Sequence, residues 1–116
     1  MAIHPIDYRY GTPEMRAVWS EENRFRATVT VEVALARAEA AHGMIPPADA
    51  ETIAACAGRA RPERAKEIEA EINHDMMAIV KTIAEVCGDA GRWIHYGATS
   101  NDILDTATAL QIRESL

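Results

Sequence analysis

Apolar side chains recur every three or four positions over two long stretches of this chain, as they do along one face of a helix. The first stretch carries Phe25, Val29, Val33, Ala36 and Ala40, with Leu35 and Ala38 widening the stripe. The second stretch carries Ile68, Ile72, Met76, Ile79, Ile83 and Val86. The alternation typical of a half-buried strand is absent, so the pattern predicts an all-α fold in which the two long helices pack antiparallel.

Start and stop signals divide the chain into about five helices. Thr12 before Pro13 predicts an N-cap and a short helix, and Ser20 predicts the cap of the first long helix, which Gly43 ends. The expected helices cover residues 13–18, 20–42, 48–57, 63–86 and 100 to the end. The residues before Thr12 show no period, and residues 89–97 are expected to form a loop.

Length and composition restrict the class of protein. A chain of 116 residues with 48% hydrophobic content can build one real core, and a net charge of −6 argues against a nucleic-acid-binding surface. Cys56 and Cys87 lie in apolar helical stretches without metal-ligand spacing, which predicts two buried free thiols. No signal peptide and no membrane-spanning apolar run is recognisable, so we expect a cytoplasmic protein that binds neither membrane nor nucleic acid.

The first candidate site is Asn73-His74-Asp75, three polar residues expected in the middle of the second long helix. Burying three such residues is costly unless they face a cleft, which favours a binding role. A histidine there can donate to a phosphate or a carboxylate, and Asp75 can hold a hydroxyl or fix the histidine tautomer. The alternative is a core histidine bonded to a backbone carbonyl.

The second candidate site is Thr99-Ser100, at the expected start of the last helix. A helix N-terminus offers unpaired N–H groups to an anion, and the two hydroxyls add donors; the alternative is ordinary N-capping, which Ser100 is expected to provide. Near the start of the chain, Arg9 and Tyr10 can clamp a phosphate through a guanidinium and a hydroxyl, or Arg9 can be a solvated charge. His95 is placed to line the same cleft.

These motifs together resemble the N-terminal domain of the adenylosuccinate lyases, within the fumarase/aspartase superfamily. The similarity covers nearly the whole chain in the same order and is fairly specific for this branch. The matching stretches are Arg9-Tyr-Gly-Thr-Pro-Glu-Met15, Trp19-Ser-Glu-Glu-Asn-Arg-Phe25, Asn73-His-Asp75, His95-Tyr-Gly-Ala-Thr-Ser-Asn-Asp102 and Asp105-Thr-Ala107.

The resemblance implies a β-elimination that releases fumarate from adenylosuccinate, leaving AMP, and from the succinylated carboxamide intermediate of purine synthesis. It implies no metal and no organic cofactor, and a homotetramer whose sites are shared among three subunits. It also implies substrate contacts near the phosphate for Arg9 and Tyr10. Contacts lining the site are implied for Asn73, His74 and Asp75, and contacts with the succinyl group for Thr99 and Ser100.

The resemblance also locates what this chain lacks. The family's acid histidine and base serine belong to a central region that follows the stretch compared here. No stop signal follows Gln111, so we expect a piece of a longer protein, although terminal fraying is the alternative. Residues 1–99 are then the N-terminal helical domain, and residues 100–116 begin a long helix of a central bundle. No catalytic residue is assigned, and we expect the chain alone to be inactive.

Two other interpretations of function stay open on the sequence alone. Another lyase of the superfamily, such as an argininosuccinate lyase, shares the helical plan but gives Arg9 no phosphate to bind. A non-catalytic helical module that oligomerises through its last helix is the second alternative. Such a module gains nothing from polar residues that converge on one cleft.

Overall fold

The computed structural model describes residue 4 and residues 6–116, and these residues form helices without any strand. The predicted all-α class is therefore confirmed. The elements in chain order are α1 Ile6–Arg9, α2 Pro13–Val18, α3 Glu21–Ala41, α4 Pro47–Cys56, the 3-10 turn η1 Ala57–Arg59, α5 Pro62–Ile72, α6 Asp75–Cys87, the 3-10 turn η2 Gly88–Trp93 and α7 Ser100–Ser115.

The caps that the sequence predicted for the first helices are confirmed. The Thr12 hydroxyl accepts the Met15 N–H at 3.2 Å, and the Ser20 hydroxyl accepts the Asn23 N–H at 3.1 Å. Each bond satisfies one N–H that a helix start otherwise leaves unpaired. Gly43 follows the end of α3 with a φ of 75°, the left-handed conformation that glycine adopts without strain.

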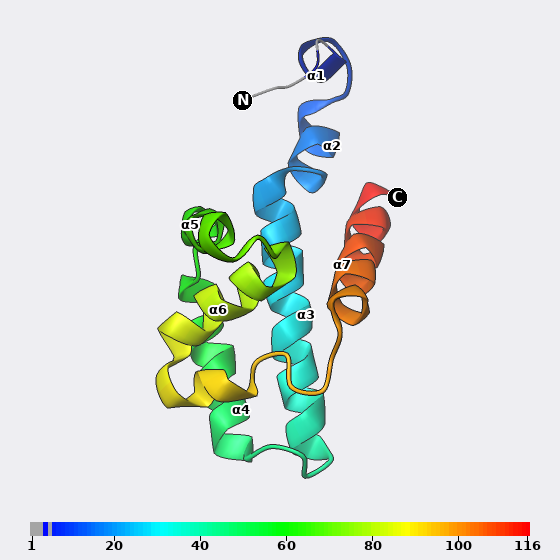
Figure 1. The fold of residues 1–116 in the computed structure, drawn as a ribbon. Helices are drawn as coiled ribbons and strands as arrows, with labels where there is room; N and C mark the ends of the chain where they lie inside the picture. The colour runs from blue at the N-terminus through cyan, green and yellow to red at the C-terminus, as the bar shows by residue number, and fades with distance from the viewer. Residues whose placement is uncertain (1–3, 5) are drawn as a thin grey trace.

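α3 is the central helix of the fold, and two helices run antiparallel to it. Figure 1 shows α4 running back along one side of α3 and α7 running back along another, while α5 and α6 form a hairpin beside α3. The predicted antiparallel pairing of α3 with one long second helix is therefore wrong. α3 pairs instead with α4 and α7, because the chain between them is divided into shorter elements.

The buried face of α3 differs from its predicted apolar stripe. Val29 and Val33 are only half-buried and Ala38 is exposed, whereas Thr28, Glu32 and Glu39 are buried. α3 packs against helices on more than one side, so its buried face is wider than the stripe and is centred elsewhere. The buried residues of α3 are Phe25, Ala27, Thr28, Val31, Glu32, Ala36 and Glu39.

The helix predicted over residues 63–86 breaks in its middle, which corrects that prediction. Asn73 adopts the left-handed conformation, with φ 55° and ψ 37°, and ends α5. Asparagine tolerates this region better than most residues because its side chain is short and polar. His74 then caps α6 by accepting the Met77 N–H on Nδ1 at 3.1 Å, so it does not lie inside a helix.

Smaller departures concern the turns between helices. Residues 6–9 form the single turn α1, although the start of the chain shows no period, and residues 88–93, which overlap the predicted loop 89–97, form η2. Both segments are too short for helical periodicity to reveal. Gly58 lies within η1 rather than ending α4. Among the described helices, none has the length and apolar character needed to cross a membrane.

Two long-range hydrogen bonds fasten the far end of α7 to the junction of α2 and α3. The Trp19 indole N–H donates to the Ser115 hydroxyl at 2.9 Å, and the Gln111 side-chain amide donates to the Val18 carbonyl at 2.9 Å. Gln111 is buried, so this bond satisfies an amide that would otherwise be costly to remove from water. The end of α7 is therefore docked on the start of α3.

Both cysteines are free thiols, as predicted. Cys87 is buried, but Cys56 is only half-buried, which corrects the expectation that both are buried. Burial raises the pKa of the Cys87 thiol to about 11, and the neighbouring Cys56 adds to the shift. The Cys87 thiolate is therefore scarce near neutral pH.

Candidate active site

The start of α6 presents an exposed histidine with a defined proton position. Because Nδ1 of His74 accepts the Met77 N–H, the ring proton lies on Nε2, which leaves a free donor on an exposed side chain. The neighbouring Asp75 accepts the Met76 N–H on Oδ1 at 2.8 Å. His74 thus acts as a helix cap and retains a donor for a ligand oxygen.

The start of α7 is capped by Thr99 rather than by Ser100. The Asp102 carboxylate accepts the Thr99 backbone N–H at 2.9 Å and the Thr99 hydroxyl at 3.2 Å. Hydrogen bonds from Thr99 lower the pKa of Asp102, so this carboxylate stays ionised at the helix start. The last helix begins at Ser100 as predicted, but its cap is Thr99, one position earlier than the predicted cap Ser100.

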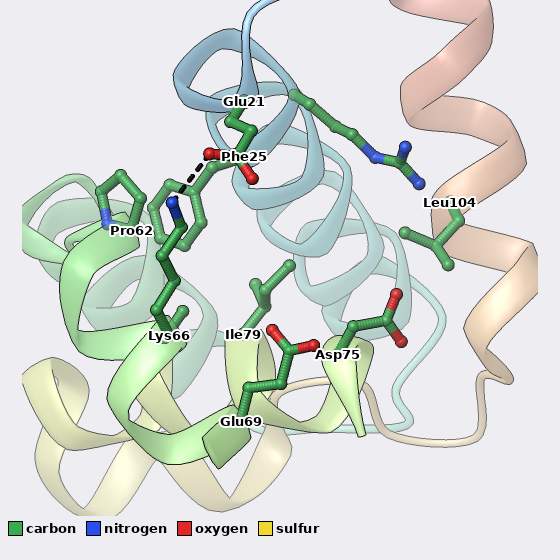
Figure 2. A pocket seen from close by; sticks show the side chains of 10 residues that line it. Glu21, Phe25, Pro62, Lys66, Glu69, Asp75, Ile79 and Leu104 are labelled. Carbon is green, nitrogen blue, oxygen red and sulfur yellow. Dashed lines mark hydrogen bonds and ion pairs between the residues drawn. The ribbon is translucent and has the colours of Figure 1, made fainter. Parts of the chain in front are cut away.

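One open pocket lies between the start of α6 and the first turns of α7. It has a volume of about 310 Å³ and is lined by Asp75 of α6 and by Leu104, one turn into α7. Figure 2 shows the Asp75 carboxylate beside Leu104, with Glu69 and Lys66 on the α5 side. Arg24 of α3 also lines the pocket, which therefore holds charges of both signs.

The rim of this pocket carries an exposed ion pair. Lys66 donates to Glu21 at 2.8 Å, and Figure 2 marks the bond with a dashed line. The hydrogen bond and charge of Lys66 lower the pKa of Glu21, and the same bond raises the pKa of Lys66. Exposed ion pairs contribute little to stability, so this pair links α3 to α5 but adds little to the free energy of unfolding.

Arg9 and Tyr10 lie apart from the other predicted site residues within one chain. Arg9 ends α1, and Figure 1 places α1 beyond the N-terminal end of α3, away from the start of α7. The Tyr10 carbonyl accepts two hydrogen bonds from the Arg16 guanidinium, at 3.0 Å and 2.5 Å. Of the predicted site residues, only Asp75 lines the pocket described above, while Asn73, His74, Thr99 and Ser100 lie outside its lining.

A buried carboxylate cluster beneath the loop before α7 escaped the sequence-based site prediction. Oε1 of Glu32 lies 2.6 Å from Nδ1 of His95, while Oε2 of Glu32 and Oε1 of Glu39 are buried without a hydrogen-bond partner. Glu32 and Glu39 are two helical turns apart on the buried face of α3. The available signal was this spacing of two glutamates within a largely apolar helix.

Burial raises the pKa of both carboxyl groups in this cluster. For Glu32 the hydrogen bond and charge of His95 oppose the shift, whereas for Glu39 the charge of Glu32 adds to it. Among the described residues, no three histidine, cysteine, aspartate or glutamate side chains are grouped so that they could hold a metal ion. The cluster is therefore a carboxylate–imidazole pair with a second acid nearby.

Replacing Glu39 with glutamine is expected to stabilise the chain by about 1 kcal/mol at pH 7. A carboxyl whose pKa is raised on folding destabilises the folded state increasingly as the pH rises from its unfolded pKa to its higher folded pKa, and the penalty is constant above that. The gain should therefore shrink towards pH 4.5, the ordinary value for a glutamate, where wild-type Glu39 is largely protonated. Urea unfolding of Glu39→Gln at both pH values measures this, and an equal gain at both would contradict a titration effect.

Comparisons with known proteins identify the family. A family model described as lyase matches residues 7–116. The chain is 58% identical over 118 residues to an adenylosuccinate lyase from Pyrococcus abyssi, a match that covers 100% of this chain and 26% of that protein. It is 46% identical over 122 residues to an N-acetyl-S-(2-succino)cysteine lyase from Dickeya dadantii, which covers 99% of this chain and 27% of the relative.

A solved structure supports the same conclusion. The β-carboxy-cis,cis-muconate cycloisomerase from Acinetobacter calcoaceticus superposes with a TM-score of 0.85 at 29% identity, over 97% of this chain and 28% of that one. The chain spans about a quarter of the length of the curated relatives it matches. The resemblance carried by the sequence motifs is confirmed by these matches, and the chain belongs to the lyase family.

Proposed function

We propose that this chain forms part of the active site of an adenylosuccinate lyase, which cleaves adenylosuccinate to AMP and fumarate by β-elimination. The same site releases fumarate from the succinylated carboxamide ribotide of purine biosynthesis. The observation that carries the proposal is the 58% identity to an adenylosuccinate lyase along the whole chain. The enzyme is proposed to act in the cytoplasm, without a cofactor.

The chemistry of the proposed substrate matches the donors at the two helix starts. Elimination removes a proton beside a carboxylate, holds the charge as an aci-carboxylate, breaks the C–N bond and protonates the nitrogen. Such a reaction needs donors aimed at carboxylate oxygens. We assign the succinyl group to Thr99 and Ser100 at the start of α7, where backbone N–H groups favour an anion. The Ser100 hydroxyl adds a donor, and the Thr99 hydroxyl, which donates to Asp102 in this structure, is proposed to turn to the ligand.

The α5–α6 junction supplies the remaining proposed contacts in this part of the site. His74 donates from Nε2, and Asp75 offers the carboxylate that lines the pocket. Asn73 holds the turn that brings both side chains to the surface, and its own side chain is exposed to a ligand. Neither His74 nor Asp75 is proposed as the acid or base of the reaction.

Arg9 and Tyr10 are assigned to the phosphate of the nucleotide. The resemblance implies a homotetramer with each site shared among three subunits, so these residues of one chain need not meet Thr99 of the same chain. In the proposed enzyme, residues 1–99 form the N-terminal domain and residues 100–116 begin a central helical bundle. Because the family's acid and base lie in that central part, we expect this chain alone to bind substrate without turning it over.

A second candidate function has a specific observation in its favour. The relative from Dickeya dadantii is named for a succinylated cysteine, and its match spans nearly the whole chain at 46% identity. Both candidate substrates carry a succinyl group, so the start of α7 serves either one. They differ in the phosphate, which only the nucleotide offers to Arg9 and Tyr10.

An NMR titration of the chain with adenylosuccinate tests the proposal. Amide signals of His74, Thr99 and Ser100 are expected to shift and saturate at concentrations where argininosuccinate and fumarate leave them unchanged. Thr99→Ala should weaken binding about tenfold, the value of one hydrogen bond to a charged group. Thr106→Ala is the matched control, because its hydroxyl donates to the Asp102 carbonyl at 2.9 Å and is not proposed to contact substrate.

Three other outcomes would count against this assignment. Equal shifts with all three ligands indicate a general anion site at the helix start. Stronger shifts with N-acetyl-S-(2-succino)cysteine than with the nucleotide favour the second candidate. Absence of any shift at His74, Thr99 and Ser100 contradicts the assignment of substrate contacts to this chain.

A further inference from the structure

His95 is held in an unusual backbone conformation just before α7. Its φ is 64°, in the left-handed region that costs a non-glycine residue free energy, and it is one of two such residues in the described part of the chain. Strain of this kind persists only where surrounding contacts fix it, and it is concentrated at functional sites. What fixes His95 is therefore informative about its role.

Two side-chain contacts hold the segment around His95 against α3 and α4. On one side, the Trp93 indole N–H donates to Asp49 of α4 at 2.8 Å. On the other side, His95 pairs with Glu32 of α3 at 2.6 Å, a short distance typical of a charge-assisted bond. The backbone adds a turn in which the Ala98 N–H donates to the His95 carbonyl at 3.2 Å.

The burial of the pair decides which ring nitrogen faces Glu32. The Glu32 side chain is 0% exposed and the His95 side chain is 12% exposed. A buried carboxylate needs a donor, and Nδ1–H is the donor within reach. Nδ1 therefore carries the proton and faces the interior, so the ring edge that bears Nε2 is the one left for a ligand.

The position of His95 connects the buried carboxylate to the start of α7. The pKa of Asp102, which caps this helix with Thr99, is lowered chiefly by the hydrogen bonds from Thr99, and the charge of His95 adds a smaller lowering. Gly97 follows with a φ of 74°, and a Cβ on it would lie 3.9 Å from Oε2 of Glu39. Glu32 is therefore bonded to His95, which precedes Thr99, the cap of α7, in the same short segment.

We propose that Glu32 is a positioning residue: it accepts Nδ1–H of His95 and so presents Nε2 to the anion bound at the start of α7. This inference rests on the proposed function for the identity of the anion. Glu32 itself does not touch the ligand, and it acts by fixing the tautomer and the turn of His95. The orphaned Oε2 of Glu32 is part of the same arrangement, because only one carboxylate oxygen faces the ring.

Long-range proton–nitrogen NMR spectra of the histidine rings test the proposal on the 116-residue chain. At about pH 8.5, where an ordinary histidine is neutral, Nδ1 of His95 is expected to carry a proton. His74 is the internal reference with the opposite tautomer, because its Nδ1 accepts the Met77 N–H. An unprotonated Nδ1 on His95 in the wild-type chain would overturn the proposal.

Variants of Glu32 separate positioning from a merely structural role. Glu32→Met, which keeps the side-chain volume but removes the acceptor, should release His95 to a mixture of tautomers, whereas Glu32→Gln should retain part of the Nδ1–H form. Glu39→Gln is the matched control, because Glu39 is a buried carboxylate on the same face of α3 and makes no hydrogen bond to His95. An unchanged tautomer in Glu32→Met, in a chain that still folds, overturns the proposal.

A ligand titration distinguishes this proposal from the proposed function. With adenylosuccinate, Glu32→Met should bind about tenfold more weakly than the wild-type chain, and Glu39→Gln should bind equally well. Equal binding by Glu32→Met overturns the link between His95 and the ligand. If adenylosuccinate, succinate and phosphate all leave the signals of the wild-type chain unchanged, the proposed function fails. The tautomer measurement then still decides whether Glu32 positions His95.

Discussion

Replacing Gly91 with alanine should destabilise the chain by about 3 kcal/mol, because the added methyl group has no space. Gly91 is buried in η2, and a Cβ there would lie 2.7 Å from the Ala84 carbonyl oxygen and 2.8 Å from the Ala84 Cα. Both atoms belong to the backbone of α6, so a helix would have to move rather than a side chain. Urea unfolding followed by circular dichroism measures the loss.

Gly58→Ala is the matched control for this prediction. Gly58 also lies in a 3-10 turn, but a Cβ there meets nothing within 4 Å and its φ is not positive. Alanine at this position should leave stability unchanged or raise it by about 0.5 kcal/mol, by restricting the unfolded chain. Equal effects of the two substitutions would show that the close approach of η2 to α6 is not tight.

Ile83→Ala should cost about 3 to 4 kcal/mol, through lost burial and the cavity that remains. Ile83 is 0% exposed in α6, the helix that contacts α3, α4, α5 and α7. The cavity would therefore lie where most of the fold meets. Because small domains have total stabilities of about 5 to 15 kcal/mol, this single change should remove a large share of the folded population on heating.

Ile112→Ala on α7 separates the effect of burial from the chemistry of the substitution. Ile112 is 48% exposed, so the same truncation should cost less than about 1 kcal/mol. Thermal unfolding of both variants, followed by the circular dichroism signal of the helices, compares their losses of stability. A similar loss in both would contradict the central position of α6 in the core.

Much of the fold was predictable because start and stop signals act locally. Thr12, Ser20 and Gly43 set helix limits through contacts within a few residues, and the structure confirms each of them. The helix end at Asn73 was not predicted, because the apolar stripe continues across this residue. Whether asparagine continues a helix or turns left-handed depends on tertiary packing, here the hairpin of α5 and α6, which a stripe does not encode.

The site could be predicted only as far as its residue types indicated chemistry. His74 and Thr99 were recognisable because polar residues stood together beside helix patterns, and Asp75, the neighbour of His74, does line a pocket. Glu32 was missed, because a charged residue in an amphipathic helix ordinarily faces water and its spacing from Glu39 is a weak signal. Its significance depends on His95, which lies 63 positions later in the sequence, and only the folded chain brings them together.

The docking of α7 on the start of α3 has a consequence for the order of folding. The Trp19–Ser115 bond spans 96 residues of chain and the Gln111–Val18 bond spans 93. Closing these long loops costs more chain entropy than pairing the neighbouring helices α5 and α6. Contacts of this range form late. Until α7 docks, the core lacks Ile103 and Ala107, and Thr99 and Ser100 are not in place. Ligand recognition is therefore expected only with the last folding step.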